Sequence, residues 1–165
     1  MATAKPDAAH FRNVMGNIAT PVSVVTAFDG NPHGTTVSAF ASLSADPPMV
    51  LVSLDTRSNI LAVISRTGRF AINVLADAQV DLALNFAVKG DDKFEGVTWG
   101  LQDGLPRLSR SSSWITCTSH KMIEGGDHVV IFGEVGRLDL DESKRPMTYH
   151  RRVFGTHSVN RQIAH

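Results

Sequence analysis

The chain has 165 residues, of which 42% are hydrophobic and 19% charged, and its 16 basic side chains are balanced by 16 acidic ones. This profile is typical of one globular domain with a sizeable core. A formal charge of zero gives no long-range attraction to a nucleic-acid backbone or to anionic lipid, so neither partner is expected. The apolar runs are far shorter than the roughly 20 residues that span a bilayer, so no membrane segment is expected.

Cysteine content and the N-terminus bear on location. The single cysteine, Cys117, excludes an intramolecular disulfide and any zinc site built from several cysteines, and it fits a reducing compartment. Residues 1–9 have no apolar stretch like that of a secretory signal. We expect them to form a disordered leader to a domain at 10–160, and we expect a cytoplasmic protein.

The first half of the chain predicts a helix followed by several strands. Apolar residues recur at three- and four-residue spacing from Phe11 to Ile18, which predicts a helix that ends near Pro21. β-Branched residues around an Asp-Gly turn predict a hairpin with strands at 22–28 and 34–40. A break at two prolines precedes a predicted strand at 49–53.

The second half predicts two short helices and further strands. Ser58 and Gly68 are typical of the start and end of a helix, and a strand at 69–75 is expected to follow. A helix capped by Asp77 is expected to bury Val80, Ala83, Leu84 and Ala87. Residues 89–110 are expected to be mostly loop, before strands at 113–123, 128–140 and 153–158. Many strands without regular helix alternation favour a closed or nearly closed antiparallel barrel with peripheral helices.

Hydroxyl side chains alternate with apolar ones at 34–44, and more hydroxyls follow at 53–59. An extended strand at 34–44 would present its hydroxyls along one side, where a flat polar ring could bind, or it is an ordinary strand facing water. In the second cluster, Arg57, Ser58 and a helix start suit a phosphate, or Ser58 is a helix cap only.

Three more segments carry polar or charged groups. Lys89 and Lys93 could balance an anion or be solvated charges. His128, beside glycines at the start of a strand, is either a ligand contact or a turn residue. The segment 149–155 is basic and suits a phosphorylated ligand or an ordinary surface.

Several familiar catalytic motifs are missing from the sequence. It contains no Gly-x-Gly-x-x-Gly motif, no phosphate-loop lysine motif, no His-Glu-x-x-His zinc motif and no Gly-x-Ser-x-Gly elbow. Cys117 lies in a strand pattern and is expected to be a packing residue.

Seven short segments together resemble the flavin reductase family, whose single-domain members serve two-component monooxygenases. They lie at 21–26, 34–40, 46–48, 70–75, 92–94, 126–128 and 133–135. The resemblance extends from Phe11 to Ser158. The second segment departs from the frequent Ser-Ser-Phe form because it reads Ser38-Ala39-Phe40, which removes one hydroxyl.

The resemblance implies a mainly β, FMN-binding split barrel with Greek-key-like antiparallel strands, and a homodimer. It implies binding of FMN or FAD, reduced by NADH or NADPH. It places the isoalloxazine ring against Thr36, Val37, Ser38, Ala39, Phe40 and Ser42. It places the ribityl chain and phosphate along Ser53, Leu54, Asp55, Thr56, Arg57, Ser58 and Asn59. Phe86, Ala87, Lys89 and Lys93 would complete the flavin site, and His128, Tyr149, Arg151 and Arg152 would face the nicotinamide.

The implied activity is hydride transfer from NADH or NADPH to flavin, with the reduced flavin released to a separate oxygenase. Because the two cofactors carry this chemistry, the protein mainly positions them, and no obligatory acid or base is expected. His128 is the candidate for positioning the nicotinamide. Two alternatives are an electron-transfer module that keeps its flavin and a structural or regulatory dimer with an empty site.

Overall fold

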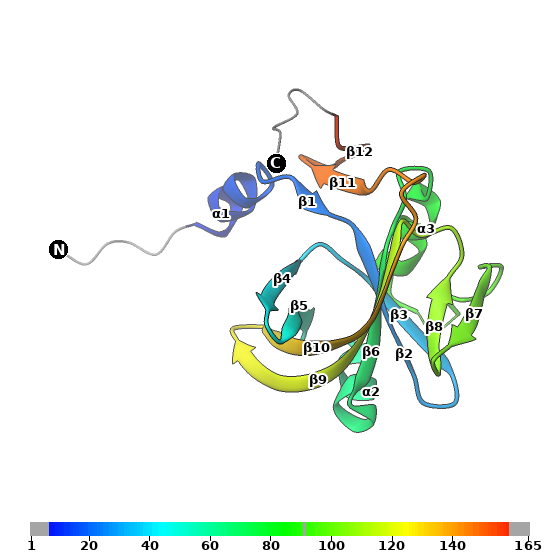
Figure 1. The fold of residues 1–165 in the computed structure, drawn as a ribbon. Coiled ribbons are helices and arrows are strands. Elements are labelled where there is room, and N and C mark those ends of the chain that lie inside the picture. Colours follow the sequence, from blue (N-terminus) through cyan, green and yellow to red (C-terminus); the bar gives the residue numbers. More distant parts are fainter. Residues whose placement is uncertain (1–6, 91, 159–165) are drawn as a thin grey trace.

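The computed structural model describes residues 7–90 and 92–158. Its elements in chain order, drawn in Figure 1, are α1 (Ala8–Met15), β1 (Thr20–Pro21), β2 (Ser23–Phe28), β3 (Pro32–Val37), β4 (Phe40–Ala45), β5 (Pro48–Asp55), α2 (Asn59–Thr67), β6 (Arg69–Val74), α3 (Val80–Ala87), β7 (Trp99–Gln102), β8 (Leu105–Leu108), β9 (Ser113–Gly125), β10 (His128–Leu140), β11 (Met147–His150) and β12 (Val153–Thr156). No helix within these two ranges combines the length and the apolar character needed to cross a bilayer.

The main antiparallel sheet has the strand order β3-β2-β6-β9-β10-β5-β4. Figure 1 shows the long strands β9 and β10 curving, so that the sheet coils round on itself. Its two edges, β3 and β4, are consecutive in the chain and are joined by Ser38 and Ala39. Within the described residues no ladder pairs these two edges, so the sheet is split there and the barrel is not closed; the predicted mainly β fold with peripheral helices is confirmed.

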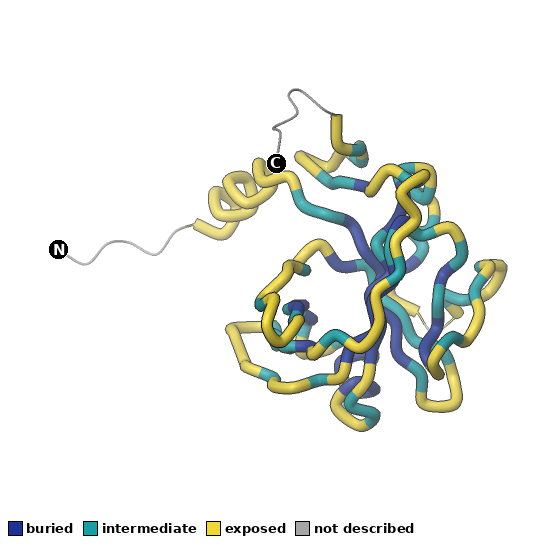
Figure 2. Tube along the Cα trace, in the orientation of Figure 1, coloured by how far each residue is buried: buried dark blue, intermediate teal, exposed yellow. Residues whose placement is uncertain are grey.

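Strand β2 runs through the middle of the core, with five of its six residues buried. Val25 and Ala27 point into a cluster that α2 covers, whereas Val24 points into a second cluster that contains Phe86 of α3. Figure 2 shows the same pattern as a buried centre under an exposed rim. Because both faces of the strand are covered, its five buried residues, 23–27, are all β-branched or small.

Buried polar side chains of the core fasten β8 to this centre. The Thr26 hydroxyl donates to the Pro106 carbonyl at 2.7 Å, and the Asn73 side-chain oxygen accepts from the Leu108 N–H at 2.8 Å. These contacts satisfy groups that would be costly to bury unpaired. They also hold the β7–β8 hairpin, which is a correction to the predicted loop at 89–110. Asp103 and Gly104 form its turn with φ values of 51° and 73°, as a primed turn requires.

The predicted ends of α2 are confirmed, whereas the predicted cap and buried face of α3 are wrong. Ser58 caps α2, and Gly68 ends it with a φ of 67°. At α3 the prediction was wrong: Gln79 is the N-cap residue, while Asp77 pairs instead with Arg145 at 2.6 Å. Leu84 is exposed and Phe86 fills the core in its place, because α3 turns a different side toward β2 and β3 than the apolar spacing indicated.

Helix α1 begins earlier and ends earlier than predicted. The Asp7 side chain caps it by accepting from the His10 N–H, so part of the predicted leader is helical. It ends at Met15, short of the predicted Pro21, and has no buried residue (Figure 2). Residues 1–6 of the predicted leader and 159–160 of the predicted domain lie outside the described residues.

Two further differences concern strands. The predicted strand at 34–40 is interrupted after Val37, because the chain there crosses from one sheet edge to the other. The strand predicted at 153–158 is present as β12, but its partner β11 was not predicted. β11 and β12 form a hairpin that adds to β1 in a separate small sheet.

Gly133 tests the packing of the barrel core. A Cβ at this position would lie 2.6 Å from Cζ of Phe70 and 3.0 Å from Cβ of Cys117, and both side chains are buried. We expect Gly133→Ala to lower the free energy of unfolding by about 1–3 kcal/mol. Gly100→Ala is the control because no atom lies within 4 Å of the added Cβ. Equal urea midpoints for the two variants would contradict this account.

Candidate functional site

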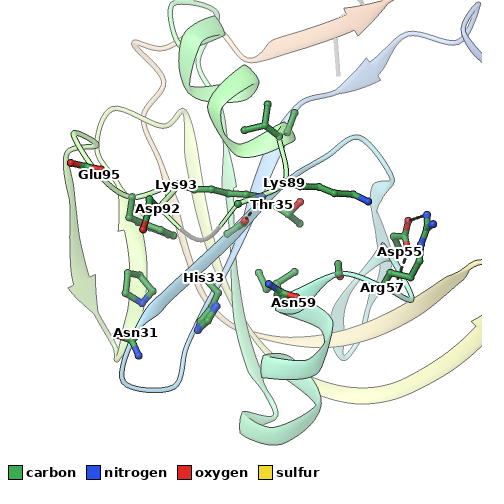
Figure 3. A pocket seen from close by; sticks show the side chains of 18 residues that line it. Asn31, His33, Thr35, Asp55, Arg57, Asn59, Lys89, Asp92, Lys93 and Glu95 are labelled. Atoms are coloured by element: carbon green, nitrogen blue, oxygen red, sulfur yellow. Dashed lines mark hydrogen bonds and ion pairs between the residues drawn. The ribbon is translucent and has the colours of Figure 1, made fainter.

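A cleft of about 860 Å³ opens between the edge strand β3, the N-terminal end of α2 and the loop after α3. Figure 3 shows side chains from these three segments converging on it. Its polar and charged lining residues are Asn31, His33, Thr35, Asp55, Arg57, Ser58, Asn59, Lys89, Asp92, Lys93 and Glu95. Its volume is in the range of small-molecule sites, roughly 300–1,000 Å³.

The α2 end of the cleft carries hydrogen-bond donors and charge. Ser58 caps α2 by accepting from the Leu61 N–H with its side chain, and this N-terminal end of the helix, where the helix dipole is positive, lies at the cleft. Arg57 and Asp55 form a fork, with contacts of 3.0 Å from Nε to Oδ1 and 2.7 Å from Nη2 to Oδ2. The Arg57 side chain holds the pKa of Asp55 well below its usual range.

The loop after α3 is fastened to the edge of β3 by Lys93. Its ammonium group donates to the carbonyls of Gly34 and Phe86, at 3.3 Å and 3.1 Å. Phe86 is buried and packs so closely on Gly34 that a Cβ there would lie 2.5 Å from its ring. Phe94 packs edge-on against Phe86, with ring centroids 4.9 Å apart. Gly34, Phe86 and Lys93 therefore build this wall together.

None of the six residues predicted to contact the ring is among the residues that line this cleft. Thr36 was expected to offer its hydroxyl to a ring, but that hydroxyl donates to the Ala83 carbonyl at 2.7 Å. The side chains of Val37 and Leu54 are in the core, like that of Phe86, so only their backbone groups could contact a ligand. The remaining residues predicted to contact the ring, which are not among the cleft residues, are Ser38, Ala39, Phe40 and Ser42.

Four residues of the segment predicted to hold the ribityl chain and phosphate meet at the cleft. Asp55, Arg57, Ser58 and Asn59 line the cleft opposite Ala87, Lys89 and Lys93. Ser53 and Thr56 lie just outside it, Ser53 on β5 and Thr56 with its N–H donating to the Asp127 carbonyl at 3.0 Å. The two segments are separated in the sequence by most of α2, all of β6 and most of α3, and the fold brings them to one cleft.

His128 lies directly across the β5–β10 ladder from Asp55. Its Nδ1 is 2.8 Å from Oδ1 of Asp127, so the carboxylate fixes the orientation of the ring. Tyr149, Arg151 and Arg152 lie elsewhere, on the β11–β12 hairpin. Tyr149 packs on Phe154 with a ring distance of 5.1 Å, and the two arginines form the hairpin turn. Their proposed contact with a nicotinamide stays a prediction.

Sequence reasoning missed the cleft residues contributed by β3. Thr35 and His33 line the cleft, and His33 lies 2.9 Å from Asp29. The side-chain hydrogen bonds from His33 and Arg66 lower the pKa of Asp29. Successive side chains of a strand point to opposite faces of the sheet, so Thr35 and Thr36 cannot face the same side. This alternation could have identified Thr35 as the threonine that faces outward.

Other reactive groups are placed away from the cleft. Cys117 is buried in the barrel, and burial raises the pKa of its thiol to about 12. A thiol with so high a pKa is not a nucleophile near neutral pH. In the described ranges, no three His, Cys, Asp or Glu side chains gather as metal ligands.

The model of the flavin reductase like domain matches residues 15–158. The chain belongs to the flavin reductase family. The reductase is 40% identical over 150 residues to the reductase component of a 4-nitrophenol 4-monooxygenase/4-nitrocatechol 2-monooxygenase from Rhodococcus opacus, covering 90% of this chain and 80% of that protein. It is 36% identical over 148 residues to a flavin reductase from Pseudomonas putida, covering 88% and 87%.

The fold of the reductase is similar to that of an NADH:FAD oxidoreductase from Streptomyces globisporus, solved in complex with NAD and FAD fragments. The TM-score is 0.90 with 28% identity, covering 98% of this chain and all of the other. The family assignment confirms the predicted resemblance and with it the predicted enzyme class, a flavin reductase.

Proposed function

We propose that the reductase transfers a hydride from NADH to FMN or FAD bound in the cleft between β3, α2 and the loop after α3, and releases the reduced flavin to a separate monooxygenase. One observation carries the assignment to this cleft: the donors of the α2 end and the lysines of the opposite loop converge on a space of about 860 Å³. That donor set suits a flavin phosphate, and the volume suits the rest of the molecule.

The residues at the two ends of the cleft have different proposed roles. The positive N-terminal end of α2, together with Arg57 and Lys89, would bind the phosphate, and Figure 3 shows Lys89 extending toward Arg57. Thr35 and the backbone of β3 would contact the ring system beside Lys93. When bound, the flavin supplies the redox chemistry by accepting hydride from a reduced nicotinamide. The protein contributes alignment of the two rings and no obligatory proton donor.

His128 is proposed to position the nicotinamide. It lies across the ladder from Asp55, and therefore beside the phosphate end of the cleft, with its side chain about half exposed. The Asp127 carboxylate accepts from Nδ1 and leaves Nε2 for a ligand. Arg151 and Arg152 are proposed to contact the dinucleotide phosphates.

The reductase is also proposed to be a homodimer. Phe11, Val14, Met15 and Ile18 are large apolar residues on or just after α1, and all are about half exposed. A helix of 8 residues is not stable in water without packing against something. Leu138 and Leu140 are also exposed, on the part of β10 beyond its pairing with β5. Covering both surfaces with a second copy would remove this apolar area from water.

The cytoplasm is the proposed location, because the one thiol in the chain fits a reducing compartment. Recovery of the reductase in a periplasmic fraction would contradict this.

The decisive assay follows oxidation of NADH and NADPH with FMN, FAD or no added flavin. We expect multiple turnovers that depend on added flavin and that are faster with NADH than with NADPH. An oxygenase added to the mixture should oxidise the reduced flavin that the reductase releases. Tightly bound flavin with negligible turnover would instead indicate an electron-transfer module. Flavin that does not raise the melting temperature would indicate an empty structural dimer, because a ligand of the folded state must stabilise it.

His128→Ala tests the nicotinamide contact. We expect KM for NADH to rise about tenfold, the loss of roughly one charge-assisted hydrogen bond. The Kd for FMN should change less than twofold. Steady-state kinetics and a flavin titration measure the two values. His120→Ala, an exposed histidine on β9, is the control and should leave both values unchanged. A larger effect on flavin binding than on NADH use would remove His128 from the nicotinamide site.

Phe11→Asp tests the dimer. A charge at this position of α1 would be buried in the proposed interface, so we expect sedimentation at micromolar concentration to show monomers. Asn13→Asp, also exposed on α1, should leave the dimer intact. A wild-type monomer, or a dimer that persists in Phe11→Asp, would exclude α1 from the interface.

A further inference from the structure

The fork between Asp55 and Arg57 lies at the end of the cleft where an anion would bind. Asp55 Oδ1 accepts from Nε of Arg57 at 3.0 Å, and Oδ2 accepts from Nη2 at 2.7 Å. Both residues line the cleft, and Figure 3 shows the pair facing the extended side chain of Lys89. The Arg57 side chain is 73% exposed, so it can leave the carboxylate without disturbing the core.

In this geometry Asp55 and a bound phosphate would both bind the guanidinium group of Arg57. Guanidinium binds carboxylate and phosphate through the same pair of parallel N–H groups. The low pKa of Asp55 keeps its carboxylate ionised at any pH at which the reductase would work. An entering phosphate must therefore take Arg57 from a carboxylate of the same chain.

We infer that Asp55 is an internal competitor of the flavin phosphate: it holds Arg57 when the cleft is empty, yields it to the ligand, and recaptures it on release. This inference rests on the proposed function and adds a residue that weakens flavin binding. Exposed ion pairs are worth little net free energy, so the exchange is readily reversible. A reductase that must release its reduced flavin gains from such a competitor, because recapture of Arg57 shortens the lifetime of the complex.

Asp55 also shapes the local turn, and the test must separate the two roles. Its Oδ1 accepts from the backbone N–H of Arg57 at 2.8 Å, and its carbonyl accepts from the Ser58 N–H at 2.9 Å. Asp55→Asn keeps an oxygen for the turn and removes the charge. Asp55→Ser is a second variant, because serine also closes such turns. If Asp55 served only the turn, these variants would bind flavin equally well or less well.

The experiment compares FMN with riboflavin, which has no phosphate, by fluorescence titration of the full chain. We expect Asp55→Asn to bind FMN about threefold to fivefold more tightly, the usual range of one exposed ion pair. Riboflavin affinity should not change. In an Arg57→Gln background the effect of Asp55→Asn should disappear, because the competition acts through that guanidinium. Asp92→Asn removes another acidic side chain of the cleft and is the matched control.

Each other result is informative. Equal tightening of FMN and riboflavin, weaker FMN binding, or an Asp55→Asn effect that persists without Arg57 or is matched by Asp92→Asn would overturn the inference and leave the proposed function standing. Failure of the wild-type reductase to bind either flavin would overturn the proposed function, and the inference with it.

Discussion

Lys93 joins the loop after α3 to the outer edge of β3, and the cleft depends on this contact. Its ammonium group binds the carbonyl of Gly34, on a strand edge that no other described strand pairs, and the carbonyl of Phe86 at the end of α3. An unpaired strand edge offers backbone groups to any partner. Here the partner is the ammonium group of Lys93, which comes from a loop and not from a further strand. The edge of β3 therefore stays open and lines the cleft.

The split in the barrel therefore has two consequences. It gives β3 an open edge that lines the cleft, and it places β4 at the far edge of the same sheet, only two residues further along the chain. The crossing at Ser38 and Ala39 is held to β5 through the Ser53 N–H. The core on both faces of β2 supports this arrangement, and the polar residues that line the cleft lie at its rim. Such a site can align two ring systems without burying a reactive side chain, as hydride transfer between cofactors requires.

Much of the local structure was predictable because it depends on neighbouring residues. Ser58 and Gly68 marked both ends of α2, the Asp-Gly turn marked the β2–β3 hairpin, and β9 and β10 were recognised from their length and composition. The β7–β8 hairpin was not, although Asp103-Gly104 is the same kind of signal. It is held by Asn73 and Thr26, partners distant in sequence that no local pattern identifies.

The sequence by itself determined the family and the mainly β architecture, and it singled out the polar segments at 53–59 and 86–93, because ordered motifs, strand periodicity and helix caps are local properties. Only the tertiary structure decided which side chains face the cleft. Thr36 turns inward to α3 while Thr35 faces outward, and Arg57 is already held by Asp55. These outcomes depend on which surface packs against which, and packing is fixed by contacts between residues far apart in the chain.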